Sequence, residues 1–363
     1  MASSSRRPSG RAPSMIDVAR AAGVSHQTVS RVLNTPDAVR EDTRRRVEQA
    51  MRGLGYRRNS TARALKTRRT GLIGVVSPGD STFGPSRMTL AIEEAAREAG
   101  YATALSVVRD PDPTSVDEAL EFFLDRGIDG IVVIAPVVAM AEAARQISRT
   151  VPVVVLASAA EQTPDMQVLG IDQVAGARMA VRHLRQGGRE RIAHVCGPEE
   201  YHDAQGRIIG WREELRDAGL PLLPLARAGG WSAADGHAAA RRVLARKGGD
   251  QGGGEAPDAI FAANDHLALG VVQAVREAGL SVPEDVAVVG FDDVDGADFF
   301  SPPLTTVRQP FEEAGAAALG SLFGAGAGGP DGATVPLVRR EASSGSSRGP
   351  SLIQPRLVVR ASG

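Results

Sequence analysis

The sequence contains a single cysteine, no long apolar run, and no apolar segment behind its arginine-containing N-terminus. The lone Cys196 excludes an internal disulfide and is typical of a reducing cytoplasm. A membrane-spanning helix needs about 20 consecutive apolar residues, and no segment supplies them. The first residues, MASSSRRPSGRAPS, lack the apolar core of a signal peptide. We therefore expect a cytoplasmic protein with no membrane partner, in which residues 1–13 form a disordered basic arm.

The chain also lacks the short motifs of common enzyme classes. There is no G-x-S-x-G turn, no phosphate-binding loop and no group of histidines and cysteines at metal-ligand spacing. Three glycines, Gly324, Gly326 and Gly329, have G-x-G-x-x-G spacing. They follow a predicted helix and not a strand, which argues against a dinucleotide site. We expect no enzymatic activity, no cofactor and no metal site.

Charge is distributed unevenly along the 363 residues, a length that predicts two or three domains. Residues 1–70 contain 16 basic and 5 acidic side chains, a net charge of +11. The remaining residues carry a net charge of −12. A basic segment ahead of an acidic body predicts that nucleic acid binds at one end only.

The segment IDVARAAGVSHQTVSRVLN, residues 16–34, predicts two short helices joined by a tight turn. Ser14 and Asp17 have the spacing of a capping box, and Gly23 is suited to end the first helix in a left-handed conformation. Ser25 can cap the second helix. The outward face of that helix carries hydrogen-bonding side chains, namely His26, Gln27, Ser30 and Arg31. A helix-turn-helix presents such a face to the DNA major groove, although a small helical bundle would also expose it to solvent.

The motif DVARAAGVSHQTVSRVLN resembles, almost residue for residue, the headpiece of the lac repressor family of bacterial transcription regulators. The resemblance implies a DNA-binding headpiece over residues 14–58 and a two-fold dimer on a pseudo-palindromic operator in double-stranded DNA. A third helix is expected to run to about Leu54, with Val47 and Met51 also on its inner face. The headpiece residues implied to bind DNA are Ser25, His26, Gln27, Thr28, Ser30, Arg31 and Asn34.

The segment NSTARALK, residues 59–66, resembles the hinge helix of the same family. Eight residues are too few for a stable isolated helix, because the marginal length in water is about 12–15 residues. We assign residues 59–70 to a hinge that folds on DNA. The resemblance implies that Asn59, Ala62 and Leu65 belong to the DNA interface, with Leu65 wedged into a minor-groove step. A plain linker is the alternative, but it gives no reason for an exposed leucine.

From Gly71 onward, short β-branched runs alternate with helical stretches, which predicts parallel sheets covered by helices. The expected fold is therefore an all-α headpiece followed by an α/β core. The family resemblance implies two doubly wound parallel-sheet lobes of the periplasmic-binding-protein type. We place the N-lobe at about 71–171 and 304–335, and the C-lobe at about 172–303 and 336–363. Of the two C-terminal segments that could form the last strand, PLVRREAS and RLVVRASG, the second is preferred. No leucine heptads follow it, so a homodimer is expected.

Seven positions match the family's ligand residues and imply a small-sugar site between the lobes. They are Asp172, Arg207, Trp231, Asn264, Asp292, Gln309 and Phe311. The adjacent Asp265 and Asp293 are expected to be caps or turn residues. The segments around these positions are closer to the lac-type members than to purine- or ribose-binding members, which implies a galactoside or similar sugar. The lac-type pattern has an aspartate after the VVVL run, where this chain has Ala157 and Ser158.

The favoured interpretation is a sugar-released repressor of sugar-utilisation genes. A regulator of the same family that the ligand activates remains an alternative. A sugar-binding protein without DNA function is a third possibility, against which the basic headpiece argues. The sequence leaves the effector, its direction of action and the target genes open.

Overall fold

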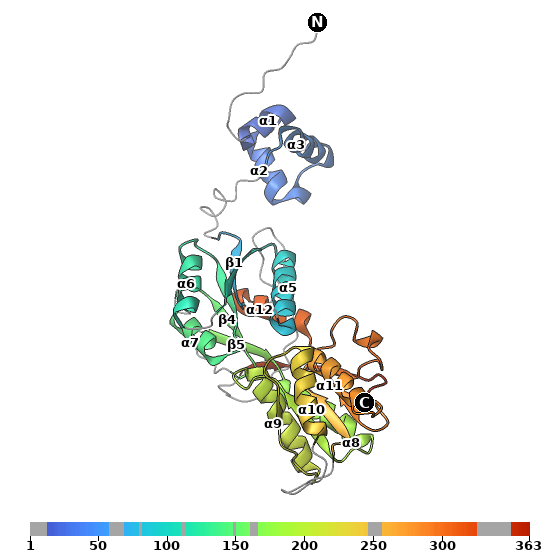
Figure 1. Ribbon diagram of the computed structural model, residues 1–363. Coiled ribbons are helices and arrows are strands. Elements are labelled where there is room, and N and C mark those ends of the chain that lie inside the picture. Colours follow the sequence, from blue (N-terminus) through green and yellow to red (C-terminus); the bar gives the residue numbers. More distant parts are fainter. Residues whose placement is uncertain are drawn as a thin grey trace. The chain divides into compact units, whose positions relative to one another are not determined.

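The computed structural model describes residues 13–57, 69–79, 82–109, 113–147, 150–159, 166–245, 256–324 and 350–363. The chain divides into two units, residues 1–70 and 71–363 (Figure 1). Most of the predicted basic arm, the whole of 59–66 and most of the two glycine-rich segments at 247–257 and 324–333 lie outside the described residues. No described helix is both long and apolar enough to cross a membrane.

The first unit contains three α-helices and a short 3-10 helix among its described residues. These are α1 (Met15–Ala22), α2 (His26–Asn34), η1 (Pro36–Ala38) and α3 (Glu41–Leu54). The predicted capping box is present, since the Asp17 amide donates to Ser14 Oγ and the Ser14 amide donates to Asp17 Oδ2. Gly23 ends α1 at φ +65°, a conformation that disfavours side chains with a Cβ.

The helices of this unit enclose a small apolar core built around Val18, Val29 and Val47. Leu54 was predicted to lie on the inner face of α3 but is exposed. It stands in the last turn of the helix, one residue before Gly55 ends it in a left-handed conformation. Arg40 occupies the cap position of α3 without a side-chain hydrogen bond, because a guanidinium offers no acceptor to the first amides of the helix.

The N-lobe is a parallel six-stranded sheet in the order β11-β5-β4-β3-β1-β2. Its strands are β1 (Leu72–Pro78), β2 (Ala102–Val108), β3 (Gly130–Ile134), β4 (Val153–Leu156), β5 (Met166–Ile171) and β11 (Ser351–Ile353). Its helices are α5 (Phe83–Glu98), α6 (Pro113–Leu124), α7 (Val138–Ile147) and α12 (Phe311–Phe323). Helices α5 and α12 cover one face and α6 and α7 the other, each over its own apolar core (Figure 1).

The C-lobe is a parallel four-stranded sheet in the order β7-β6-β8-β9, extended by an antiparallel ribbon of β10 and β12. Its strands are β6 (Ile192–Cys196), β7 (Ala226–Arg227), β8 (Ala259–Ala262), β9 (Ala287–Val289), β10 (Thr306–Arg308) and β12 (Arg356–Val358). Its helices are α8 (Gln173–Gln186), α9 (His202–Asp217), α10 (Ala233–Leu244), α11 (Asp265–Glu277) and η2 (Ala297–Phe299). Apolar cores lie under α10 and α11 on one face and under α8 and α9 on the other.

Two predicted lobe boundaries are wrong. Residues 351–353 were assigned to the C-lobe, but β11 pairs with β5 at the edge of the N-lobe sheet. The chain passes from one lobe to the other three times, and the third of these crossings therefore falls at 354–355. Residues 304–308 were assigned to the N-lobe, but β10 pairs with β12 in the C-lobe, so the second crossing falls at 309–310. Both strands have three residues, too short for a recognisable apolar pattern. The preferred C-terminal segment does form the last strand.

Candidate functional site

The start of α2 exposes the polar face that the sequence predicted. Ser25 caps the helix by accepting a hydrogen bond from the Thr28 amide at 3.1 Å. His26, Gln27 and Arg31 are exposed, whereas Val29 is fully buried in the core beneath them. The cap fixes the helix start, and the buried valine fixes its rotation. As a result, His26 and Gln27 are held in the first turn of α2 and Arg31 in its last turn.

A basic groove of about 500 Å³ adjoins this face and is lined by residues of α2 and α3. Arg31, Arg40 and Arg46 line it, and within the described residues none of the three makes an ion pair. By contrast, Arg45 pairs with Glu41, and Arg44 lies within 3.9 Å of Glu48. The charges of the three arginines beside the α2 cap are thus not neutralised by described residues of the headpiece. Such a surface suits phosphate oxygens.

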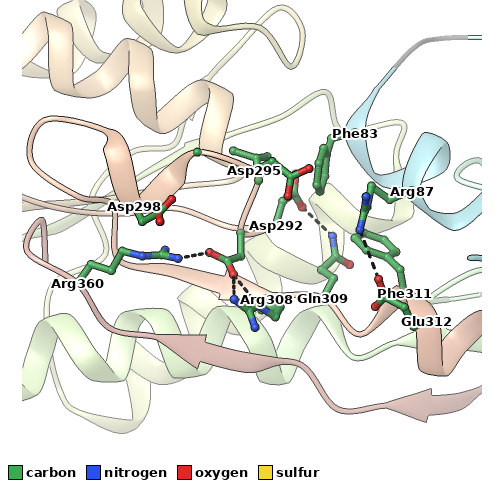
Figure 2. A pocket seen from close by; sticks show the side chains of 13 residues that line it. Phe83, Arg87, Asp292, Asp295, Asp298, Arg308, Gln309, Phe311, Glu312 and Arg360 are labelled. Carbon is green, nitrogen blue, oxygen red and sulfur yellow. Dashed lines mark hydrogen bonds and ion pairs between the residues drawn. The ribbon is translucent and has the colours of Figure 1, made fainter. Parts of the chain in front are cut away.

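The core holds two cavities on either side of Gln309 and Phe311, where the chain passes from β10 to α12. The larger, about 390 Å³, is lined by Phe83 and Arg87 of α5 and by the turn that follows β9. Figure 2 shows Asp292 and Gln309 joined by a hydrogen bond at this cavity, with Asp295 and Asp298 nearby. The smaller, about 60 Å³, lies where β3, β4 and β5 end against α9.

Arg207, on α9, is a buried cation with several partners. Its Nε donates to Gln173 Oε1 at 2.9 Å, and its Nη1 donates to the Ala263 carbonyl. Its Nη2 lies 3.8 Å from Asp292 Oδ1, and its Cζ lies 3.9 Å from the centroid of the Phe291 ring. Because these groups fix its plane, the guanidinium is held as a preorganised fork for hydroxyl or carboxylate oxygens.

Asp292 is buried at the end of β9, in a backbone conformation with φ +115°. Burial raises its pKa to about 6, although Arg207 and the Gln309 amide oppose this effect. The side-chain Nε2 of Gln309 donates to Asp292 Oδ1 at 2.7 Å, while Nε2 of Gln173 donates to Gln309 Oε1 at 3.0 Å. The structure therefore brings Arg207, Asp292 and Gln309 together, with Gln173 as a fourth member that the sequence analysis missed.

Trp231 and Asn264 lie beside this network but line neither of the two cavities. Asn264 is the cap of α11, since its Oδ1 accepts from the Leu267 amide at 2.7 Å, and its Nδ2 donates to the Trp231 carbonyl. Both of its polar atoms are thus already engaged. The Trp231 ring lies 5.7 Å from Arg207 Cζ, and its buried Nε1 has no hydrogen-bond partner among the described residues. This donor is available to a ligand oxygen.

Asp172 lies at the first crossing and has structural partners. It caps α8 by accepting from the Ala175 backbone N–H at 2.8 Å. It also accepts from the side-chain Nε2 of Gln354, at the third crossing between the lobes, at 3.1 Å. Asp172 lines neither cavity. Of the seven predicted ligand positions, Gln309 and Phe311 line both cavities and Asp292 lines the larger one.

Asp265 is not the cap of α11, because Asn264 takes that position. Asp265 is fully buried, accepts from the Val294 amide at 2.8 Å and from Thr306 Oγ1, and so clamps the turn that carries Asp292. Burial, followed by the charge of Asp292, raises the pKa of Asp265 to about 8. A Cβ added at Gly290 would lie 2.2 Å from Asp265 Oδ1, so glycine makes room for the clamp.

Asp293 is a turn residue as expected, at φ +56°, and it is ion-paired with Arg308 and Arg360.

A helix-turn-helix headpiece ahead of a two-lobed core of the periplasmic-binding-protein type defines a DNA-binding regulator. Residues 14–59 match the model for bacterial regulatory proteins of the lacI family, and residues 181–362 match that for periplasmic binding protein-like domains. The chain is 32% identical to the lactose operon repressor of Escherichia coli (strain K12), over 85% of this chain and 83% of that one. It is 34% identical to the transcriptional regulator DegA of Bacillus subtilis (strain 168), over 83% and 87%.

The structural comparison agrees with the sequence comparisons. The crystal structure of the lac repressor dimer bound to operator and the anti-inducer ONPF matches with a TM-score of 0.75 at 30% identity, over 97% of this chain and 99% of that one. The chain belongs to the lacI family of bacterial regulatory proteins. It is a transcriptional repressor of that family and not an enzyme.

Proposed function

We propose that the protein is a cytoplasmic, homodimeric repressor of sugar-utilisation genes, released from its operator by a small galactoside-like sugar. The observation that carries the proposal is that one chain contains both of the following sites. One is the exposed face of α2 beside three unpaired arginines. The other is the buried polar set of Arg207, Asp292 and Gln309 where the lobes meet.

In the DNA-bound state, the start of α2 enters the major groove. His26, Gln27 and Arg31 read base edges, with Arg31 suited to a guanine, while Ser25, Thr28, Ser30 and Asn34 complete the interface. Arg40 and Arg46 would neutralise phosphates. Asn59, Ala62 and Leu65 lie outside the described residues, so their role in a DNA-folded hinge rests on the sequence resemblance.

Two features support a sugar as effector. Apolar side chains such as Pro85, Met88 and Phe311 line the N-lobe side of the smaller cavity. The Gln173 amide and the Asp203 carboxylate line its C-lobe side, and the Arg207 guanidinium lies behind them with its Nε 2.9 Å from Gln173 Oε1. A pyranose presents an apolar face and a rim of hydroxyls, which this division matches. A ligand that strengthens DNA binding is the alternative within the family, and the same residues would hold it.

A homodimer is supported by apolar side chains that are exposed on the described core. Phe299 is 86% exposed and Leu90 is 60% exposed, so burial of these side chains against a second copy would remove apolar surface from water. Further exposed apolar residues are Leu105, Val107 and Leu269. Two headpieces in a two-fold dimer would require a pseudo-palindromic operator.

The proposal is tested by a thermal-shift screen of galactosides beside ribose, cellobiose and maltose. A ligand of the folded cleft raises the unfolding temperature as its concentration increases. DNA binding is tested with Leu65→Ala in a gel-shift series on an operator fragment obtained by selection. We expect about tenfold weaker operator binding, because the wedge contact is lost, and unchanged sugar binding. Equal operator affinity would remove Leu65 from the interface.

A further inference from the structure

One hydrogen bond joins the two lobes directly across the smaller cavity. Ser158 Oγ, just beyond β4 of the N-lobe, donates to Asp203 Oδ1, in the first turn of α9 of the C-lobe, at 2.8 Å. Beside it, the amide of His202 donates to the Pro136 carbonyl of the N-lobe at 2.9 Å. These two hydrogen bonds join the lobes at this edge.

Asp203 restores the acceptor that the sequence comparison found missing. The chain has Ala157 and Ser158 where the lac-type pattern has an aspartate, and the carboxylate stands instead on the opposite lobe. Asp203 Oδ2 lies 3.9 Å from Arg207 Nη2, so the carboxylate also adjoins the buried polar network. Its side chain is 40% exposed, which leaves the carboxylate accessible once Ser158 withdraws.

The cavity beside this pair is too small for a sugar. Its volume is about 60 Å³, whereas small-molecule sites occupy roughly 300 Å³ or more. A ligand can occupy it only if the lobes separate there. Separation moves Ser158 away from Asp203, because each residue belongs to a different lobe. The carboxylate then loses its hydroxyl partner, and a ligand hydroxyl can replace it.

We propose that Ser158 and Asp203 form a latch that a sugar hydroxyl displaces, and that Asp203 is therefore a specificity-determining acceptor of the effector site. This inference rests on the proposed sugar function for its second half only. The latch itself is formed by two side chains of this chain, so it can be measured on protein to which no sugar has been added. The two residues have opposite effects on the ligand: Asp203 holds it, whereas Ser158 competes with it.

The binding test uses methyl β-D-galactopyranoside, lactose and D-galactose with the full-length chain in calorimetry. Asp203→Ala should bind about tenfold more weakly or worse, since a hydrogen bond to a charged acceptor is lost. Ser158→Ala should bind about three- to tenfold more tightly, since the competing hydroxyl is gone. In the Asp203→Ala background, Ser158→Ala should have no further effect. Asp203→Asn, which keeps an acceptor oxygen, should fall between the wild type and Asp203→Ala.

The ligand-free test measures amide hydrogen exchange at His202, whose N–H reports contact between the lobes. Ser158→Ala and Asp203→Ala should each lower its protection by about three- to tenfold. Ser77→Ala is the matched control. It removes a hydroxyl that accepts from Thr89 Oγ1 within the N-lobe, and His202 protection should not change.

Reduced protection together with opposite effects on sugar affinity would support the latch. Unchanged protection at His202, or a Ser158→Ala variant that binds sugar more weakly, would overturn it. If the wild type binds none of the three sugars while protection still falls, the latch stands and the galactoside proposal fails.

Discussion

The two lobes share one architecture but present opposite chemistry to the space between them. The strands of the N-lobe end at this space in apolar residues such as Ile134 and Leu156. In the C-lobe, the buried Asp292 follows β9, and Arg207 Nη2 lies 3.8 Å from its Oδ1. The C-lobe therefore holds fixed polar groups in a buried setting, and the N-lobe supplies the apolar surface that the proposed sugar would contact. Removing C-lobe polar groups should harm ligand binding most, and altering the N-lobe side should harm it least.

The largest effect is expected from Asp292→Asn. The substitution keeps the shape but removes the charge that faces Arg207 and accepts from Gln309. Effector affinity should fall about 100-fold in calorimetry, because a charged acceptor is lost and Arg207 loses its counter-ion. Asp298→Asn is the matched control, since Asp298 lines the same cavity but is exposed (Figure 2). The effector affinity of the Asp298→Asn variant should stay within about twofold of the wild-type value, as expected for an exposed charge. Equal losses in both variants would mean that the burial of Asp292 is irrelevant.

The second prediction concerns the pH dependence of the C-lobe. The pKa of Asp265 is raised from 3.8 to about 8, so the folded chain binds an extra proton between those values. The stability that this carboxyl contributes is fully present below its unfolded pKa and is lost as pH rises through about 8. Asp265→Asn should therefore flatten the decline of the unfolding free energy between about pH 5 and about pH 9. Urea denaturation at both pH values checks this, with Asp298→Asn expected to retain the wild-type slope.

The smallest effect is expected on the N-lobe side, from Phe311→Leu. Phe311 is buried at the start of α12 and lines both cavities. The leucine keeps an apolar surface, so effector affinity should fall by about fivefold at most, as for the loss of an aromatic contact. The unfolding free energy should fall by about 1 kcal/mol. A loss of affinity equal to that of Asp292→Asn would contradict the division of chemistry between the lobes.

Features that depend on neighbouring residues were predicted from the sequence, whereas features that depend on distant parts of the chain were not. Helix caps and the left-handed Gly23 depend on neighbours in sequence, and the roles of Ser14, Ser25 and Gly23 were predicted correctly. Strands β10 and β11 depend on partners far along the chain, and their three residues carry little pattern of their own. They were therefore assigned to the wrong lobe.

The site shows the same limit. Arg207, Asp292 and Gln309 were expected to bind a ligand because they match a family pattern, and the structure brings their side chains together. Gln173 and Asp203 were not singled out in the sequence because they contact residues 136 and 45 positions away, respectively. Asp265 was expected to be a cap or turn residue, although only tertiary packing explains a fully buried carboxyl. The chain has Ala157 and Ser158 where the lac-type pattern has an aspartate, and this difference in the sequence indicates that another side chain supplies the acceptor.

The central claim is that a sugar binds where the lobes meet and is held by the buried polar groups of the C-lobe. The most direct measurement is the sugar-induced thermal shift of Arg207→Ala beside Arg97→Ala, which removes an exposed arginine that lies within 3.8 Å of Glu93 on the same helix. The account predicts that Arg97→Ala responds to sugar as the wild type does, whereas Arg207→Ala folds and binds operator but shows no shift. A normal concentration-dependent shift in Arg207→Ala would contradict the account.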